Sequence, residues 1–329
     1  ENGESLTQVK ERFEKVSQNN FSEHASINKL DFDVNSVTGA LEVTINGNTY
    51  RTCKNAEKDL CRITGVPYGY YKKIGSDLKL RNLRTRSMHL DKEQKFRLNS
   101  DYNLLRGVID PKNEDFPNHQ IFDTLINNGF KDYGVQFFSE FFDEMDLLTT
   151  KDIQFRILLD KFNSEPQAGN YSGMHFNASE LGSTFSMAPL VYRQVCDNGM
   201  IALSKDRHKA FSISYKKMDR SIIIGLVGNL TEQWRNNLEK VDNHISTLIE
   251  TSVNDEDMTE FFGYLQERAV SKSFIKDLKS SLEGRTYSWW ELMNLATSMA
   301  HDVIQDDKKR YVLEREVSNY SGITELMFS

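Results

Sequence analysis

The chain has 329 residues, of which 38% are hydrophobic, and it carries a formal net charge of −7. This length fits one or two domains, and 20 Phe and 13 Tyr supply enough bulky apolar surface for a sizeable core. With only 5 Pro and no Gly/Ser tract, the composition argues against a fibrous or disordered chain. The apolar stretch Ile222–Val227 is far too short to span a bilayer, so we expect no membrane segment.

The first residues, Glu1–Glu4, lack a basic region followed by an apolar one, so we expect no signal peptide. Three cysteines, Cys53, Cys61 and Cys196, are too few for a secreted disulfide framework and favour a reducing compartment, the cytoplasm. Their spacing does not match a zinc site, and the seven His are scattered along the chain. We therefore expect neither a metal nor a cofactor.

Period-two patterns predict strands in the first two thirds of the chain. Apolar and polar residues alternate over 30–34 and 40–45, and 49–52 follows a turn, which predicts three short antiparallel strands. A helix is expected over 54–64, a hairpin over 95–109, and a helix from Pro117 to about residue 128. Further strands are expected at 134–142, 152–160, 172–177, 183–195, 199–203 and 210–216.

The apolar spacing becomes helical from Thr231 onward and predicts a long amphipathic helix over 231–251. Ser288 followed by Glu291 matches a capping box and predicts the start of a later helix. Other helices are expected at 255–268, 271–282 and 306–319.

The fold class that follows is α+β, with an antiparallel β-sheet body and a helical C-terminal region. We place the β-rich body at 1–230 and the helical region, packed on it, at 231–329. Gly225 and Gly228 supply too few glycines for a dinucleotide-binding loop, so we expect a strand end or turn there.

Positive charge is concentrated in one part of this acidic chain. Between Arg51 and Arg106, 14 Lys and Arg face 6 Asp and Glu, which gives this stretch a charge of +8 and the remainder −15. A smaller basic stretch follows at 204–220. Such asymmetry suits binding to a phosphate backbone. The alternative is an ordinary solvated face balanced by acidic neighbours.

Three tyrosines directly precede two lysines at 68–73. Aromatic rings stack on unpaired bases while Lys binds phosphates, although tyrosines also pack in cores, and we expect at least one of the three to do so. The candidate nucleic-acid-binding residues are Tyr68, Tyr70, Tyr71, Lys72, Lys73, Arg81, Arg84, Arg86, Arg106 and Arg193. We expect side chains from 51–106 to converge on one positive face, with contributions from Lys72, Lys73, Arg81, Arg84 and Arg86.

The sequence shows no recognisable enzyme active site. Cys196 has no local context that would activate it with His175 or His208. The acidic run 140–146 lacks the Gly and terminal Glu of a calcium loop, and we expect a polar strand end there. We therefore expect no catalytic residue, and an enzyme ranks third among the functions considered.

A motif in residues 169–201 resembles the central signature of the domain of unknown function 932 family of phage/plasmid-like proteins. The matching residues are Asn177, Glu180, Gly182, Arg193, Cys196, Asn198 and Gly199. Weaker matches at 105–121 and 288–297 extend the resemblance over about 80–320. It implies a mobile-element setting in a bacterial cytoplasm and no known catalytic residues. The same residues can instead be structural, with Asn198 and Gly199 in a tight turn and Arg193 paired with Glu180.

The function expected first is nucleic-acid binding in phage or plasmid DNA metabolism, with single strands favoured and strand annealing as its sharpest form. The alternatives are a virion component, or a protein-interaction factor that modulates a host system. An interaction factor would use tryptophan anchors from Trp234, Trp289 and Trp290, although we expect Trp234 and one of the adjacent pair to be buried. The sequence is compatible with a homo-oligomer and with a phage or host protein as partner.

Overall fold

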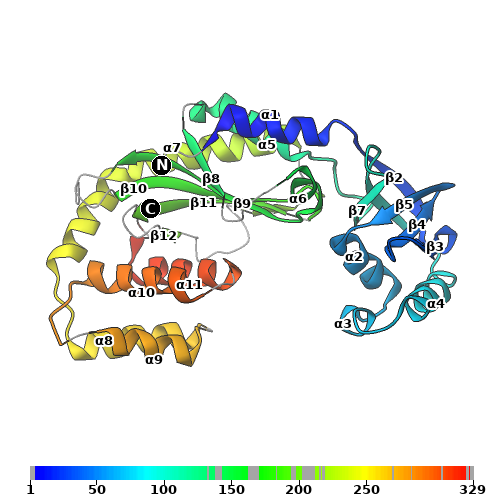
Figure 1. The fold of residues 1–329 in the computed structure, drawn as a ribbon. Helices are drawn as coiled ribbons and strands as arrows, with labels where there is room; N and C mark the ends of the chain where they lie inside the picture. Colours follow the sequence, from blue (N-terminus) through cyan, green and yellow to red (C-terminus); the bar gives the residue numbers. More distant parts are fainter. Residues whose placement is uncertain are drawn as a thin grey trace.

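A computed structural model describes residues 4–131, 133–137, 143–161, 170–182, 184–193, 198–201, 212–214, 216, 219–268, 270–282, 284–304, 307–323 and 326. Its strands form two sheets (Figure 1). Each sheet contributes to its own large hydrophobic core. The predicted α+β class is confirmed, with antiparallel sheets and helices at the C-terminal end.

The smaller sheet is built from residues 20–109. Its strands are β2 (Asn20–Ser26), β3 (Asp31–Val34), β4 (Leu41–Ile45), β5 (Asn48–Thr52), β6 (Glu93–Asn99) and β7 (Leu104–Ile109). They lie in the order β2-β6-β7-β5-β4-β3, and every pair is antiparallel except β5 with β7. The helices of this unit are η1 (Ile27–Lys29), α2 (Lys54–Thr64), α3 (Tyr68–Tyr71) and α4 (Ser76–Ser87).

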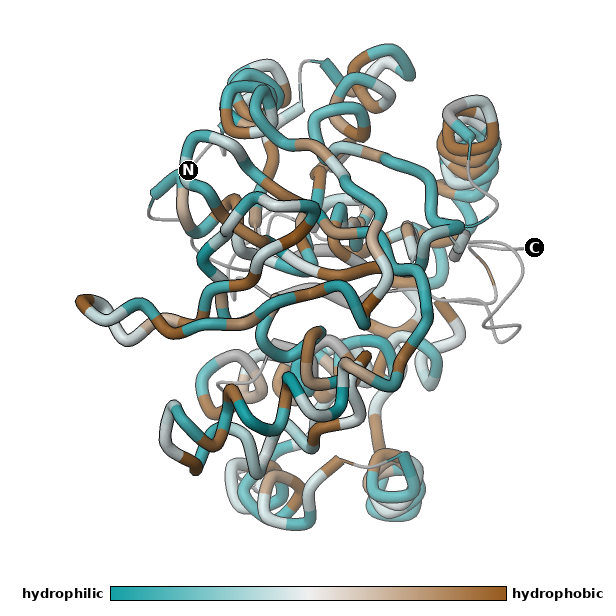
Figure 2. Tube along the Cα trace, turned by 90° about the vertical axis from the view of Figure 1, so that its right-hand side faces the viewer, coloured by the Kyte–Doolittle hydropathy of each residue, from teal (hydrophilic) through white to brown (hydrophobic). Residues whose placement is uncertain are grey.

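Local sequence explains the first strands of this sheet. Leu41, Val43 and Ile45 alternate with half-buried polar residues, so one face of β4 enters the core. Asn46 and Gly47 join β4 to β5 with φ angles of 49° and 88°, the left-handed pair that a two-residue hairpin requires. Figure 2 views the molecule from the side on which this unit lies and shows hydrophobic and hydrophilic residues alternating along the chain.

The larger sheet carries most of the remaining strands. They are β1 (Glu4–Ser5), β8 (Gly134–Phe137), β9 (Ile153–Lys161), β10 (Asn170–Ala178), β11 (Thr184–Arg193), β12 (Asn198–Ile201) and β13 (Ser212–Ser214). All their pairings are antiparallel, in the order β1-β8-β9-β10-β11-β12 with β13 beside β11. Phe155 and Phe176 stack at 4.9 Å on the face that enters the core, whereas Arg156 and His175 alternate with them along the same strands.

Helices lie on both faces of the larger sheet (Figure 1). One group comprises α1 (Leu6–Ser17), α5 (Asn118–Leu125), η2 (Ile126–Phe130) and the first part of α7 (Arg220–Glu250), and the short α6 (Glu144–Thr149) lies near the junction with the smaller sheet. The other group comprises α10 (Trp289–Val303) and α11 (Asp307–Tyr320), which contact β12, and an outer layer of α8 (Asp255–Glu267) and α9 (Lys272–Ser281).

The long helix α7 begins earlier than expected. Asp219 caps it by accepting a hydrogen bond from the N–H of Ile222. Ile223 and Val227, four residues apart, are buried in the larger core, so the segment is one helical face rather than a strand end or turn. The expected division at 230/231 consequently falls inside α7. No helix in the described ranges is both long and apolar enough to cross a membrane.

Helix α1 belongs to the larger core although it precedes the smaller sheet in the sequence. Ser5 and Gln8 form a capping box at its start. Leu6, Val9 and Phe13 then pack in the same core as α5 and β8. The smaller unit is therefore an insertion between α1 and α5, an arrangement that residues 1–22 did not reveal.

Candidate nucleic-acid interface

Positive charge gathers on α3, α4 and their connection, which together we call the α3–α4 surface. From Pro67 to Met88 the chain carries six Lys and Arg against one acidic residue, Asp77. The six are Lys72, Lys73, Lys79, Arg81, Arg84 and Arg86. The surface lies on the smaller unit, at one end of the molecule (Figure 1).

The three tyrosines of α3 have different environments. Tyr71 is only 1% exposed and packs in the smaller core, so a base cannot reach its ring. The prediction that Tyr71 contacts nucleic acid is therefore corrected. Burial raises the pKa of Tyr71 far above its usual range. Tyr68 is half-buried and stacks on Tyr71 at 6.1 Å, whereas Tyr70 is 48% exposed. Tyr70 is therefore the ring best placed to stack on an unpaired base.

Two lysines are positioned over these rings. Lys72 Nζ lies 5.4 Å from the centre of the Tyr68 ring, and Lys79 Nζ lies 4.8 Å from that of Tyr71. Cation–π attraction of this kind limits the motion of a lysine without neutralising its charge. Lys79 was not among the residues predicted from the sequence, although its spacing of seven from Arg86 on one helix could have indicated it.

The charged residues of α4 do not all point the same way. Leu83 and Ser87 face the core, and the 100° step between residues then puts Arg81 with Arg84 on one flank and Arg86 with Lys79 on the other. Arg84 turns toward β3, where it donates to the Phe32 carbonyl and lies 3.5 Å from Asp31. The expected single positive face is thus split, and Arg84 is held against β3 although its side chain stays partly exposed.

The other basic side chains of this surface keep their charges free for a ligand. In the part of the chain that the structure describes, Lys72, Lys73, Arg81 and Arg86 are exposed and form no ion pair with a carboxylate. Exposed ammonium and guanidinium groups near an exposed aromatic ring can hold phosphates while the ring stacks on a base. Within the described residues, no direct ion pair with a carboxylate thus balances any of these four charges.

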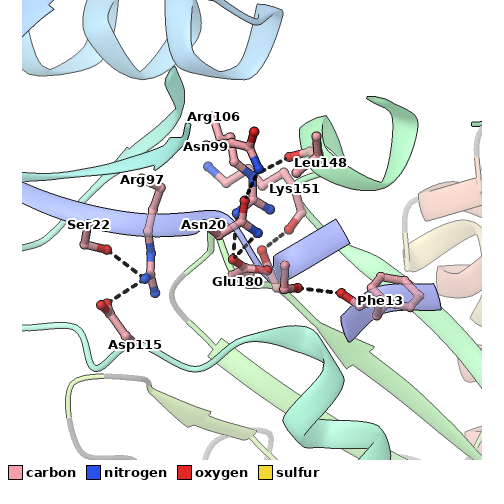
Figure 3. A network of polar contacts seen from close by, with 12 residues as sticks. Phe13, Asn20, Ser22, Arg97, Asn99, Arg106, Asp115, Leu148, Lys151 and Glu180 are labelled. Carbon is pink, nitrogen blue, oxygen red and sulfur yellow. Dashed lines mark hydrogen bonds and ion pairs between the residues drawn. The ribbon is translucent and has the colours of Figure 1, made fainter. Parts of the chain in front are cut away.

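Arg106 has a structural environment instead. Its side chain is 2% exposed, pairs with Glu180 at 2.6 Å and donates through Nε to the Leu148 carbonyl at 2.8 Å (Figure 3). A buried guanidinium cannot reach a phosphate backbone, so Arg106 also leaves the predicted set. The backbone of Arg193 ends β11, but its side chain lies outside the described residues, as does most of the basic stretch 204–220.

Glu180 is the centre of a polar network between the two sheets. Burial alone raises the pKa of this carboxyl, but Arg106, Arg97 and the backbone N–H of Asn118 outweigh burial and hold the pKa below its ordinary value. Asn20 of β2 approaches the same carboxylate at 3.4 Å. The partner expected for Glu180 was Arg193, whereas the structure pairs it with Arg106.

A second part of this network involves residues that the sequence did not single out. Arg97 donates to Ser22 at 2.9 Å and pairs with Asp115 at 2.6 Å (Figure 3). Lys95 reaches the same carboxylate at 2.5 Å. Nothing in local spacing brings β6 to Asp115, so only the fold reveals this pairing. The network joins strands of the smaller sheet to segments that pack on the larger one.

The cysteines and the acidic residues are the other candidates for chemistry. Burial raises the pKa of the Cys53 thiol and raises that of Cys61 to about 11, so both thiols are protonated at neutral pH. Cys196 and residues 140–142 of the acidic run lie outside the described residues, and Asp143 caps α6. Within the described residues, no group of three or more His, Cys, Asp or Glu is placed to hold a metal ion.

Comparison with protein-family models, curated proteins and solved structures found no match for this chain.

Proposed function

We propose that this protein binds nucleic acid, with single strands favoured, through the α3–α4 surface. The observation that carries the proposal is the exposed ring of Tyr70 followed closely by Lys72 and Lys73, two exposed cations that form no ion pair within the described residues. Helix α4 adds the exposed Arg81 and Arg86 on its two flanks. Cations supply affinity for any phosphate backbone, and an exposed ring adds stacking that only an unpaired base can use. A setting in phage or plasmid DNA metabolism, strand annealing and membership of the domain of unknown function 932 family are parts of the same proposal.

The experiment measures binding of a fluorescently labelled 30-nucleotide single strand at low salt, with the matching duplex and RNA alongside. Lys72→Glu with Lys73→Glu is expected to weaken single-strand affinity by about tenfold or more, because two attractive interactions with phosphates become repulsive. The salt dependence of log affinity should also become shallower, by about 0.7 for each phosphate that the variant no longer neutralises.

The matched control is Lys131→Glu with Lys240→Glu, which makes the same change in net charge at exposed positions of the larger unit. If this control weakens binding as much as the Lys72 and Lys73 change does, overall charge rather than the α3–α4 surface determines affinity, and the proposal fails.

Stacking is tested separately from charge. Tyr70→Ala is expected to lower single-strand affinity by roughly fivefold to a hundredfold and to leave duplex affinity nearly unchanged, since base stacking contributes about 1–3 kcal/mol. Phe21→Ala, at an exposed aromatic residue of β2, is the control. Equal losses for single strand and duplex in Tyr70→Ala would exclude stacking.

The three tryptophans on which the protein-interaction alternative depends have little exposed surface in this fold. Trp234 and Trp290 are 0% and 2% exposed, as expected for Trp234 and one of the adjacent pair. Trp289 is half-buried and packs against Phe261 and Tyr320 at 6.1 and 5.6 Å. Tryptophans held in this way stabilise the helical region and offer little ring surface to a partner.

A further inference from the structure

A second group of lysines lies on the outer helix α9, which packs beside α8 at the opposite end of the molecule from α3 and α4 (Figure 1). Helix α8 itself is acidic and contributes the uncharged Gln266 to the hollow between them. An open pocket of about 380 Å³ occurs there, a size at the lower end of small-molecule sites. Its lining residues are Gln266, Lys272, Ile275, Lys276, Lys279 and Ser280.

Helix geometry puts the three lysines of α9 on one stripe. Lys272, Lys276 and Lys279 are separated by four and three residues, so they lie within about 60° of one another around the helix axis. The adjacent Phe274 and Leu278 enter the core and fix this orientation. Asp277, the acidic residue within α9, lies about 100° or more from the stripe.

These lysines have no carboxylate to balance them in the described part of the chain. Their ammonium groups appear in no ion pair, and the nearby carboxylate of Glu267 faces Arg268 at 3.7 Å. Lys279 Nζ lies 4.9 Å over the Phe262 ring of α8, which holds it at the pocket. Three like charges around one hollow repel each other, and a bound anion would relieve that repulsion.

We infer that the α8–α9 pocket is a binding site for a phosphate group. A phosphate carries up to two negative charges and several acceptor oxygens, so it can accept from three ammonium groups and the Gln266 amide together. A single carboxylate has one charge and would leave part of the lysine charge unbalanced. The phosphate could come from a small phosphorylated molecule, which supplies two charges at one group, or from a nucleic-acid backbone, which supplies one charge at each of several successive phosphates. The inference stands apart from the α3–α4 surface, because it uses different residues.

Inorganic pyrophosphate is the probe, titrated into the full chain by isothermal calorimetry at low ionic strength. Saturable binding is expected, and Lys276→Gln with Lys279→Gln should weaken it by about tenfold or more, since each charge-assisted hydrogen bond contributes substantially. Wild-type protein should also gain thermal stability with pyrophosphate, and this shift should be absent from the variant. Circular dichroism of the variant checks that the helices remain folded.

Two controls separate this site from the α3–α4 surface. Lys72→Gln with Lys73→Gln should keep full pyrophosphate affinity, as should Lys131→Gln. A single-stranded oligonucleotide then identifies the source. A backbone phosphate predicts that Lys276→Gln with Lys279→Gln lowers DNA affinity and that pyrophosphate competes, whereas a small-molecule source predicts unchanged DNA affinity. Absence of saturable pyrophosphate binding, or equal affinity in wild type and Lys276→Gln with Lys279→Gln, overturns the inference.

Discussion

Arg106 and Glu180 lie 74 residues apart in the sequence, and their ion pair joins β7 of the smaller sheet to the segment after β10. Both side chains are buried, so neither has water as an alternative partner. Removing one partner leaves an uncompensated charge, and this cost exceeds the net stabilisation that the pair provides. The pair therefore makes the junction sensitive to single substitutions.

Glu180→Gln is expected to lower the free energy of unfolding by about 3–5 kcal/mol at pH 7, measured by urea denaturation. The lowered pKa of Glu180 means that this contribution is present above its unfolded-state pKa of about 4.3 and is lost as pH falls. The difference between wild type and variant should consequently shrink in acid. Glu144→Gln breaks an exposed pair with Lys15 and serves as the control with little expected effect.

His175 is a second residue that makes the free energy of unfolding depend on pH. Burial, with a smaller effect from Arg156, holds the pKa of His175 at about 3 against an ordinary value of 6.5. Below pH 6.5 the unfolded chain binds a proton at this histidine that the folded chain does not bind. The free energy of unfolding therefore falls by about 1.4 kcal/mol for each pH unit as the pH is lowered between these two values. His175→Gln should remove this slope in urea midpoints measured from pH 7 to 5. His89→Gln, at an exposed position, should leave the slope intact.

At the scale of single elements, glycines in α7 and β10 have opposite surroundings. A Cβ on Gly225 would meet nothing within 4 Å, whereas one on Gly173 would lie 2.7 Å from the Ile157 carbonyl oxygen of the neighbouring strand. Gly225→Ala should therefore raise the free energy of unfolding by about 0.5–1 kcal/mol through helix propensity. Gly173→Ala should lower it, because backbone atoms must move. Equal effects in thermal or urea unfolding would contradict this assignment.

Elements with a complete local signal were the ones that the sequence predicted well. The hairpin of β4 and β5 combines alternation with the Asn46–Gly47 turn, and the capping box of Ser288 and Glu291 marks the start of α10. The predicted start of α7 at Thr231 was wrong. Ile222 and Gly225 have low helix propensity, but packing against the sheet overrides that propensity and the helix begins at Arg220.

The candidate site shows the same division between local and long-range information. The run of charge at 72–86 was readable from the sequence, but the burial of Tyr71 beside an exposed Tyr70 depends on how α3 meets the smaller core. The engagement of Arg84 by β3 and of Arg106 by Glu180 depends on contacts between distant segments. Composition therefore indicated where cations gather, and only tertiary structure separated the available ones from those already paired.

At the scale of the whole molecule, the two large hydrophobic cores are separate clusters of residues, and we expect them to unfold as separate units. All three tryptophans, Trp234, Trp289 and Trp290, lie in or against the larger core. Tryptophan fluorescence consequently reports only that core, whereas far-ultraviolet circular dichroism reports both. We expect the two urea transitions to differ, and Glu180→Gln to separate them further, since it weakens the junction. Coincident transitions in wild type and variant would show that the cores unfold as one unit.

The place of α1 also has a consequence for how the chain is made on the ribosome. The sheet formed by residues 20–109 has all its strands within one continuous stretch, whereas the apolar face of α1 needs α5 and β8. At typical synthesis rates, α1 emerges on the order of ten seconds before those partners. Leu6, Val9 and Phe13 therefore lack their packing partners while the neighbouring unit folds, so α1 is synthesised before that unit and reaches its final place after it.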